Sequence, residues 1–258
     1  MISQLAERLL CKIPKVYLAC LGLHGQYNCE KAAYLKLIRA GFVLVEVGAN
    51  EGYFTRLFGN LVGKNGRVLA FEPITKTRER LHDNVKDIKS VKIFPYAISN
   101  KTGEFPMFIP GSTHGQASLC EHSDPWWGQE GAISTENVQC SPLDQLDEIK
   151  YLDKIDFMKI DVEGAELEVL KGAREILERD HPVLHLEIEE RWMKSFGYGA
   201  AEIEEFLRGI GYTDFMTYDF DWTRLKSLVG IGSVNVVCSA CSLGSLWKTE
   251  AIRGTMTL

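Results

Sequence analysis

The amino-acid sequence predicts an α/β domain built on a doubly wound, mostly parallel sheet. Short apolar segments rich in β-branched residues alternate with segments whose apolar residues recur at helical spacing. Repeated strand–helix–strand units of this kind form parallel sheets with right-handed crossovers. The chain has 258 residues, of which 45% are hydrophobic and 25% charged, so its composition is that of an ordinary globular protein.

Residues 1–40 are expected to form an N-terminal helical cap, followed by a main domain over residues 41–258. Apolar residues recur at helical spacing in three stretches of the cap, which Pro14 and a glycine-containing segment separate. No stretch has the ~18–20 apolar residues of a membrane-spanning helix, and no small-residue cleavage site is evident. We therefore expect folded structure here rather than a signal peptide.

The first half of the main domain shows the alternation most clearly. Phe42–Val47 is apolar almost throughout and predicts a strand buried on both faces. A glycine turn, Gly48–Gly52, leads into a helix whose apolar residues fall on one face: Phe54, Leu57, Phe58, Leu61 and Val62. A second strand is predicted at Arg67–Phe71, a helix over about 77–87, and a third strand at Val91–Ile98.

Residues 99–150 interrupt the alternation and are interpreted as an insertion on the substrate side. Asn100–Gly103 is typical of a hairpin turn into a strand at Glu104–Ile109. A long polar loop, residues 110–136, is the expected lid, and Asn137–Ser141 is a further candidate strand.

The alternation then resumes to the end of the domain. Ile155–Ile160 and Val183–Ile188 are predicted strands that flank a helix at Ala165–Glu178. A further helix has four apolar residues at helical spacing: Ile203, Phe206, Leu207 and Ile210. Thr213–Tyr218 and Ser233–Cys238 predict a final antiparallel pair.

Candidate ligand-binding residues follow from the sheet itself, because doubly wound sheets bind ligands at the carboxyl ends of their strands. That edge collects Gly48–Gly52, Glu72, Ala97–Ile98, Asp161–Glu163 and Glu187. The glycines allow a tight turn and a close ligand, but their spacing is not the G-x-G-x-x-G of nicotinamide enzymes. Glu46 in the preceding strand suits a cationic amine better than a pyrophosphate.

Glu72 ends the second strand, 24 positions after Gly48. A carboxylate at this place can accept hydrogen bonds from the hydroxyls of a ribose. The alternative is a solvated loop acid. Together with the glycine turn, Glu72 favours a nucleoside ligand.

Further acidic residues end the later strands. Asp161 and Glu163 follow one strand, and Glu166 is explained by the favourable charge of a helix first turn. Glu187 shares a strand face with His185, although a histidine within a strand is more often a satisfied core residue.

The predicted lid contains candidates for substrate contact, namely Trp126, Trp127 and His114. The tryptophan pair is either a local anchor or a stacking platform for a flat or sugar-like substrate. The spacing of the histidines is too irregular to indicate a metal.

Charge and cysteine content restrict the partners and the compartment. The net charge is −6, so no basic field attracts nucleic acid or a membrane surface. The seven cysteines follow no disulfide pattern, and Cys238-x-x-Cys241 has no second pair to complete a zinc site. We expect a cytoplasmic protein.

Several segments resemble the FkbM family of S-adenosylmethionine-dependent methyltransferases. They are VLVEVGANEGYFTRLF, GRVLAFEP, YAISNKTGE, SPLDQL and DFMKIDVEGAELEVLKGA, with Asn84 in its expected place. The resemblance covers residues 42–190 and is specific because KIDVEGAE occurs together with GANEG and FEP. The family usually has aspartate at position 46, where glutamate should keep the role.

The resemblance implies a class I methyltransferase fold, which is Rossmann-like, with seven strands and an antiparallel last hairpin. It implies that S-adenosylmethionine lies with its methionine end against Glu46, Gly48, Asn50 and Gly52. Glu72 would then hold the ribose, and Tyr96, Ala97 and Ile98 would border the adenine. The expected substrate is a hydroxylated small molecule such as a sugar or polyketide. Apart from the resemblance, the helical N-terminus could cap the site or pack against a second subunit in a homodimer.

The expected reaction is in-line transfer of a methyl group to a hydroxyl oxygen, which needs orientation and a base. Asp161 is the first candidate base, followed by Glu163 and Glu187, and then His185. Alternatively, Asp161 and Glu187 ligate Mg²⁺, which would lower the pKa of the hydroxyl. The rival functions are an RNA or protein methyltransferase, a nicotinamide-dependent oxidoreductase and a non-catalytic binding protein.

Overall fold

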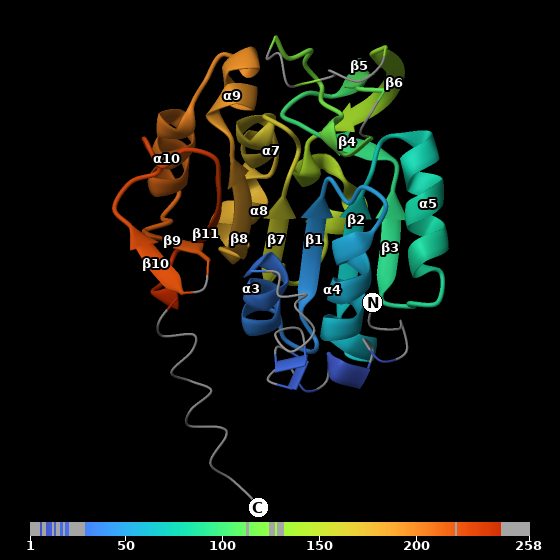
Figure 1. Ribbon diagram of the computed structural model, residues 1–258, viewed down its shortest axis with the longest axis vertical. Helices are drawn as coiled ribbons and strands as arrows, with labels where there is room; N and C mark the ends of the chain where they lie inside the picture. The colour runs from blue at the N-terminus through green and yellow to red at the C-terminus, as the bar shows by residue number, and fades with distance from the viewer. Residues whose placement is uncertain are drawn as a thin grey trace, which may run out of the picture.

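The computed structural model describes residues 6, 9–11, 13, 16–17, 19–20, 29–111, 114–123, 127, 132–219 and 221–243. An eight-stranded sheet with helices on both faces forms its centre (Figure 1). In spatial order the strands are β10 (Trp222–Leu225), β9 (Asp214–Tyr218), β11 (Val234–Ser239), β8 (Val183–Ile188), β7 (Phe157–Ile160), β1 (Val43–Val47), β2 (Arg67–Phe71) and β3 (Val91–Phe94). The predicted doubly wound α/β architecture is confirmed.

Five neighbouring strands, β3, β2, β1, β7 and β8, run parallel. β11 is antiparallel to both β8 and β9, so the predicted antiparallel final pair is confirmed. The sheet has eight strands rather than seven, because β10 pairs with the outer edge of β9. The chain order reverses between β1 and β7, which places the switch point of the sheet, and hence the expected ligand site, at these two strands.

Helices cover each face of the sheet in a way that follows from strand alternation. Leu44 of β1 packs with α3 (Cys29–Leu37) and α4 (Tyr53–Val62), and α5 (Thr75–Val85) lies beside α4. Val45 and Val47 pack with the other set: α7 (Glu166–Gly172), α8 (Arg174–Asp180) and α10 (Ala200–Gly209). The predicted helix Ala165–Glu178 is divided at Ala173, whose φ of −116° is not helical.

Short helical elements connect the larger ones. The α-helical turns are α6 (Asp147–Lys150) and α9 (Glu190–Met193). The 3₁₀ turns are η1 (Gly63–Asn65), η2 (His114–Gln116), η3 (Leu143–Gln145) and η4 (Lys194–Phe196). Of the predicted cap, α3 confirms helix at 29–37, and most of residues 1–28 lie outside the described residues. Among the described residues, no helix is long and apolar enough to cross a membrane.

The predicted third strand, Val91–Ile98, is two strands in two sheets. Pro95 separates β3 from β4 (Tyr96–Ile98), because proline has no N–H with which to continue a ladder. β4 joins a small sheet in which β6 (Ser134–Ser141) lies between β4 and β5 (Gly103–Ile109). The hairpin predicted at Asn100–Gly103 is therefore wrong: β4 pairs parallel and β5 antiparallel with β6, not with each other.

The small sheet lies at the carboxyl ends of the central parallel strands (Figure 1). After β5 the chain turns back and runs antiparallel to it. Phe108 of β5 and Ser118 exchange two backbone hydrogen bonds of 2.8 and 3.0 Å. We call residues 114–123 and 127 the lid, since they are the described part of the loop for which that role was predicted. The lid is thus attached to the edge of the small sheet and adjoins the switch point.

Candidate active site

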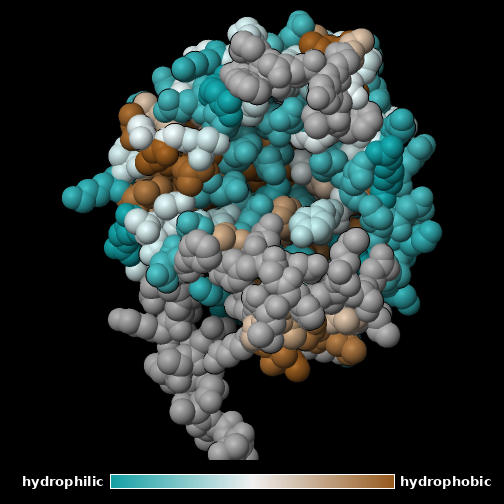
Figure 2. All heavy atoms as spheres, viewed as in Figure 1, coloured by the Kyte–Doolittle hydropathy of each residue, from teal (hydrophilic) through white to brown (hydrophobic). Residues whose placement is uncertain are grey.

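A pocket opens at the carboxyl ends of β1, β2 and β7, with about 700 Å³ of space that is partly open to solvent. The surface is hollowed in this region, and hydrophilic side chains gather around the hollow (Figure 2). Seven of the predicted site residues line the pocket: Gly48, Asn50, Glu72, Ala97, Ile98, Asp161 and Glu163. The lid contributes Gly115, Ala117 and Leu119 to its wall.

The glycine turn after β1 requires its glycines. Gly48 has a φ of +81°, and a Cβ there would overlap the carbonyl oxygen of Asp161, the residue that follows the neighbouring strand β7. Gly52 has a φ of +88° and precedes α4, where a Cβ would press on Leu81. Gly52 does not line the pocket, so its structural contribution is to allow the turn.

Glu72 is held at the end of β2 by main-chain groups. One carboxylate oxygen accepts a hydrogen bond from the Asn50 N–H at 2.9 Å, and the other accepts one from the Ile74 N–H at 2.9 Å. The side chain is only 5% exposed, and burial raises its pKa to about 7 although both hydrogen bonds oppose this shift. A carboxylate has about four acceptor sites, so two are left for a ligand.

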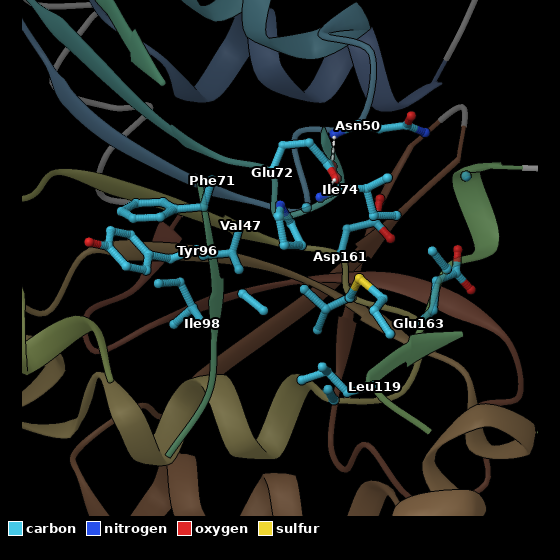
Figure 3. A pocket seen from close by; sticks show the side chains of 18 residues that line it. Val47, Asn50, Phe71, Glu72, Ile74, Tyr96, Ile98, Leu119, Asp161 and Glu163 are labelled. Carbon is cyan, nitrogen blue, oxygen red and sulfur yellow. Dashed lines mark hydrogen bonds between the residues drawn. The ribbon is translucent and has the colours of Figure 1, made fainter. Parts of the chain in front are cut away.

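One side of the pocket combines an apolar surface with an oriented carboxylate. Figure 3 shows the side chains of Phe71, Tyr96 and Ile98 grouped on one side, which gives a flat apolar surface. Glu72 lies beside them with its orientation fixed by Asn50 (Figure 3). An apolar surface for a base next to an oriented carboxylate for ribose hydroxyls matches the two halves of an adenosine.

Three carboxylates meet near the opposite side of the pocket. Single oxygens of Asp161, Glu163 and Glu187 all lie within 4.8 Å of one another. Lys159, only 2% exposed, donates a hydrogen bond of 2.7 Å to Asp161. Burial opposes the ionisation of Asp161, but the Lys159 ammonium holds the pKa of this carboxyl below its ordinary value. Asp161 is thus an ionised group next to two other acids.

The other two acids hold protons more strongly than usual. Burial and then the neighbouring charges of Glu187 and Asp161 raise the pKa of Glu163 to about 9. Burial and the charge of Asp161 raise the pKa of Glu187 to about 7. One oxygen of Glu187 is buried without a hydrogen-bond partner among the described residues. These environments separate the proton affinities of three adjacent carboxyl groups.

Glu46, His185 and Glu187 are predicted residues that are not among those lining the pocket. Glu46 is 1% exposed and lies beside Lys159 in the β1–β7 register, and burial raises its pKa to about 7. His185 is also 1% exposed, with Nδ1 3.2 Å from the Tyr34 hydroxyl and Nε2 hydrogen-bonded to Tyr218. Burial and then Lys159 lower the pKa of His185 to about 3, as expected for a neutral core histidine.

The remaining predicted residues belong to the lid. Trp127 is 4% exposed, donates a hydrogen bond of 2.9 Å to the Gln116 carbonyl and packs its ring against His122. This is the arrangement of a local anchor. The main chain of His114 begins η2, and Trp126 lies outside the described residues.

Sequence reasoning missed Lys159 and the lid wall. A lysine within the otherwise apolar strand Phe157–Ile160 was an available signal, because buried lysines are rare unless they are paired. The lid residues Gly115, Ala117 and Leu119 carry no pattern that distinguishes them from other loop residues.

The strand order and the pocket at the switch point are those of a class I methyltransferase fold. A sequence model of the methyltransferase FkbM domain matches residues 46–213, and the chain belongs to this family. The resemblance found in the sequence is confirmed.

Among curated proteins, the chain is 29% identical over 147 residues to the 2-O-methyltransferase NoeI of Sinorhizobium fredii, across 52% of this chain and 58% of that protein. It is 30% identical over 158 residues to the methyltransferase sdnD of Sordaria araneosa, across 51% of this chain and 60% of that one. The chain thus matches about three fifths of the length of these relatives.

Solved structures with a similar fold include a methyltransferase FkbM from Methylobacillus flagellatus, at 17% identity and a TM-score of 0.47, which covers 81% of this chain and 50% of that one. Aeropyrum pernix fibrillarin with bound S-adenosyl-L-methionine is similar at 12% identity and a TM-score of 0.46, across 79% of this chain and 68% of that one.

Proposed function

We propose that this protein is an S-adenosylmethionine-dependent methyltransferase that methylates a hydroxyl group of a small molecule. The observation that carries the proposal is a single pocket with an oriented Glu72 at one side and the Asp161–Glu163–Glu187 carboxylates near the other. Membership of the FkbM family and the name of the relative NoeI, a 2-O-methyltransferase, support it. When bound, S-adenosylmethionine supplies a methyl group on a positively charged sulfur.

Specific residues would hold the methyl donor. Glu72 accepts hydrogen bonds from the ribose hydroxyls, and the adenine is bordered by Tyr96, Ala97 and Ile98. Gly48 and Asn50 leave room for the methionine end between β1 and β7. Glu46 and Gly52 do not line the pocket and act indirectly, Glu46 through its charge next to Lys159 and Gly52 by allowing the turn.

Glu187 is the base that the electrostatics favour. Catalytic bases work best when their pKa lies near the working pH, and that of Glu187 is about 7. The lowered pKa of Asp161 makes it a weaker base and suits it to accepting a hydrogen bond from the acceptor. Glu163 is protonated at neutral pH and can donate a hydrogen bond. His185 is enclosed by Tyr34 and Tyr218, away from the pocket wall.

A magnesium ion is the second way in which the acids could activate the hydroxyl. Mg²⁺ prefers carboxylate oxygens, and three of them lie within 4.8 Å of one another here. An ion on Asp161 and Glu187 would lower the pKa of a bound hydroxyl without a protein base. Dialysis against a chelator separates the two proposals: turnover that is lost and then restored by Mg²⁺ supports the metal, and unchanged turnover supports Glu187.

The acceptor is a small hydroxylated molecule in this proposal. The net charge of −6 and the acids at the pocket disfavour a polyanion such as RNA. Family membership disfavours the nicotinamide-dependent oxidoreductase. The homodimer stays a prediction.

The test has two stages. Calorimetry should show binding of S-adenosylhomocysteine and none of NADH, and absence of S-adenosylhomocysteine binding overturns the proposal. A screen of sugars, polyols and phenols with isotope-labelled donor should then identify an acceptor that gains the mass of one methylene. Transfer to RNA or to a peptide, with none to a small molecule, would contradict the acceptor class alone.

A further inference from the structure

We propose that His122 of the lid is a positioning residue for Glu163. Through the Glu163 carbonyl it fixes the main-chain conformation that directs the Glu163 carboxyl toward the pocket. Its consequence for methyl transfer rests on the proposed function, whereas its effect on the lid does not.

Two lid side chains converge on one main-chain oxygen. His122 Nε2 lies 3.0 Å from the carbonyl oxygen of Glu163, and the buried Ser118 hydroxyl donates a hydrogen bond of 2.9 Å to the same oxygen. A carbonyl can only accept, so His122 Nε2 must carry a proton. Its Nδ1 lies 2.9 Å from the Ser195 hydroxyl, which links the lid to η4. We call the two bonds to the Glu163 carbonyl the clasp.

The clasp acts on a strained segment. Glu163 has a φ of +53°, a left-handed conformation that residues with a side chain rarely adopt. Gly164 follows with a φ of +101°, and a Cβ there would come within 2.7 Å of the Trp192 main chain. The turn therefore lies between the lid on one side and α9 on the other. Strain of this kind persists only where the surroundings enforce it.

The same lid forms part of the pocket wall. Gly115, Ala117 and Leu119 line the space that Glu72 and Glu163 also line. Loss of the clasp would make this wall more mobile and would at the same time remove the constraint on the Glu163 main chain. The position of the lid wall and the placement of a pocket acid thus depend on the same two hydrogen bonds.

Ring packing is the competing explanation for His122. The centroid of its ring lies 4.7 Å from that of the Trp192 ring and 5.1 Å from that of the Trp127 ring, and His122 is 5% exposed. Two substitutions separate the roles. His122→Phe keeps a ring and removes the donor, whereas His122→Gln keeps an N–H donor near the ε position and removes the ring. His82→Ala on the exposed face of α5 is the matched control.

The experiment combines amide hydrogen exchange of the ligand-free protein with calorimetry using S-adenosylhomocysteine. We expect His122→Phe to speed exchange at residues 114–123 and 162–164 and to weaken S-adenosylhomocysteine binding, each by about tenfold. His122→Gln and His82→Ala should stay within about twofold of the wild type in both measurements.

A reversed pattern, with His122→Phe like the wild type and His122→Gln impaired, overturns the clasp in favour of packing. Equal exchange in all the variants also overturns it. If the wild type binds no S-adenosylhomocysteine, the proposed function fails, while the exchange data still decide the clasp. Thermal unfolding of each variant identifies any that fail to fold, and Ser118→Ala then tests the other bond of the clasp by the same exchange measurement.

Discussion

The two sides of the pocket hold their carboxylates in opposite ways. Glu72 has a main-chain N–H on each oxygen, and both bonds are 2.9 Å long. Asp161, Glu163 and Glu187 face one another, and among the described residues Lys159 supplies the positive charge hydrogen-bonded to this group. The contrast teaches that, in the proposed function, recognition uses an acid fixed by main-chain donors. Proton transfer uses neighbouring acids whose pKa values are separated by burial and by one another's charges.

The largest effect on turnover should come from removing the proposed base among Asp161, Glu163 and Glu187. Glu187→Gln keeps the shape and removes the charge, so turnover should fall by about 10²–10⁴-fold while S-adenosylhomocysteine binding is kept. Initial rates with labelled donor measure this, and the exposed Glu205→Gln is the control. If Asp161→Asn abolishes turnover and Glu187→Gln does not, the order of bases expected from the sequence is the right one.

Substitution of Glu72 should weaken binding of the methyl donor rather than slow methyl transfer. Glu72→Ala removes two charged acceptors for ribose hydroxyls, so S-adenosylhomocysteine should bind about 100-fold more weakly. Turnover at saturating donor should change much less. Calorimetry provides the affinity, with the exposed Glu79→Ala as the control. Unchanged affinity in the Glu72 variant would place the ribose elsewhere.

The pH dependence of activity should reflect the ionisation of Glu187. A base must be deprotonated to act, and the pKa of Glu187 is about 7, so activity should increase as the pH rises through this value. Below it, kcat/KM should fall by about tenfold for each pH unit. A profile that stays flat from pH 5 to 8 would exclude Glu187. The residual activity of Glu187→Gln should lack this limb.

The smallest effect concerns stability. The folded-state pKa of Glu163 is about 9, above its ordinary value of 4.5, so the folded protein keeps a proton that the unfolded chain releases. Glu163 therefore makes the fold less stable as the pH rises from about 4.5 to 9. Glu163→Gln should raise the Tm by about 5 °C at pH 8 and by little at pH 5. An equal gain at both pH values would show that charge is not the cause.

The fold was predictable wherever local pattern and tertiary environment agree. β2 and β8 have the predicted bounds, because Arg67–Phe71 and Val183–Ile188 are apolar segments whose length fits a buried strand. β10 was missed because Trp222–Leu225 is a half-exposed edge strand with no strong alternation. The change of sheet at Pro95 depends on where β6 lies, which local sequence does not encode.

The site was predictable as far as strand ends determine it. Glu72 and Asp161 follow directly from the rule for doubly wound sheets. The clasp could not be found in this way, because His122 and Glu163 are 41 positions apart in the sequence. His122 also lies in a loop that has no periodic pattern. The relative proton affinity of Asp161 and Glu187 also depends on where Lys159 places its ammonium.

The change of sheet at Pro95 bears on how such a protein can be re-engineered. β4, with Tyr96, Ala97 and Ile98 in the pocket wall, is paired to β6. β6 also pairs with β5, to which the lid is hydrogen-bonded through Phe108 and Ser118. Transplanting residues 99–150 from a relative would replace the partner strand of β4, which we propose borders the adenine. It would also replace the loop that we propose faces the acceptor. Under the proposed function, acceptor choice and donor affinity are therefore inherited together, and a chimera made at these boundaries would need to be reselected for both.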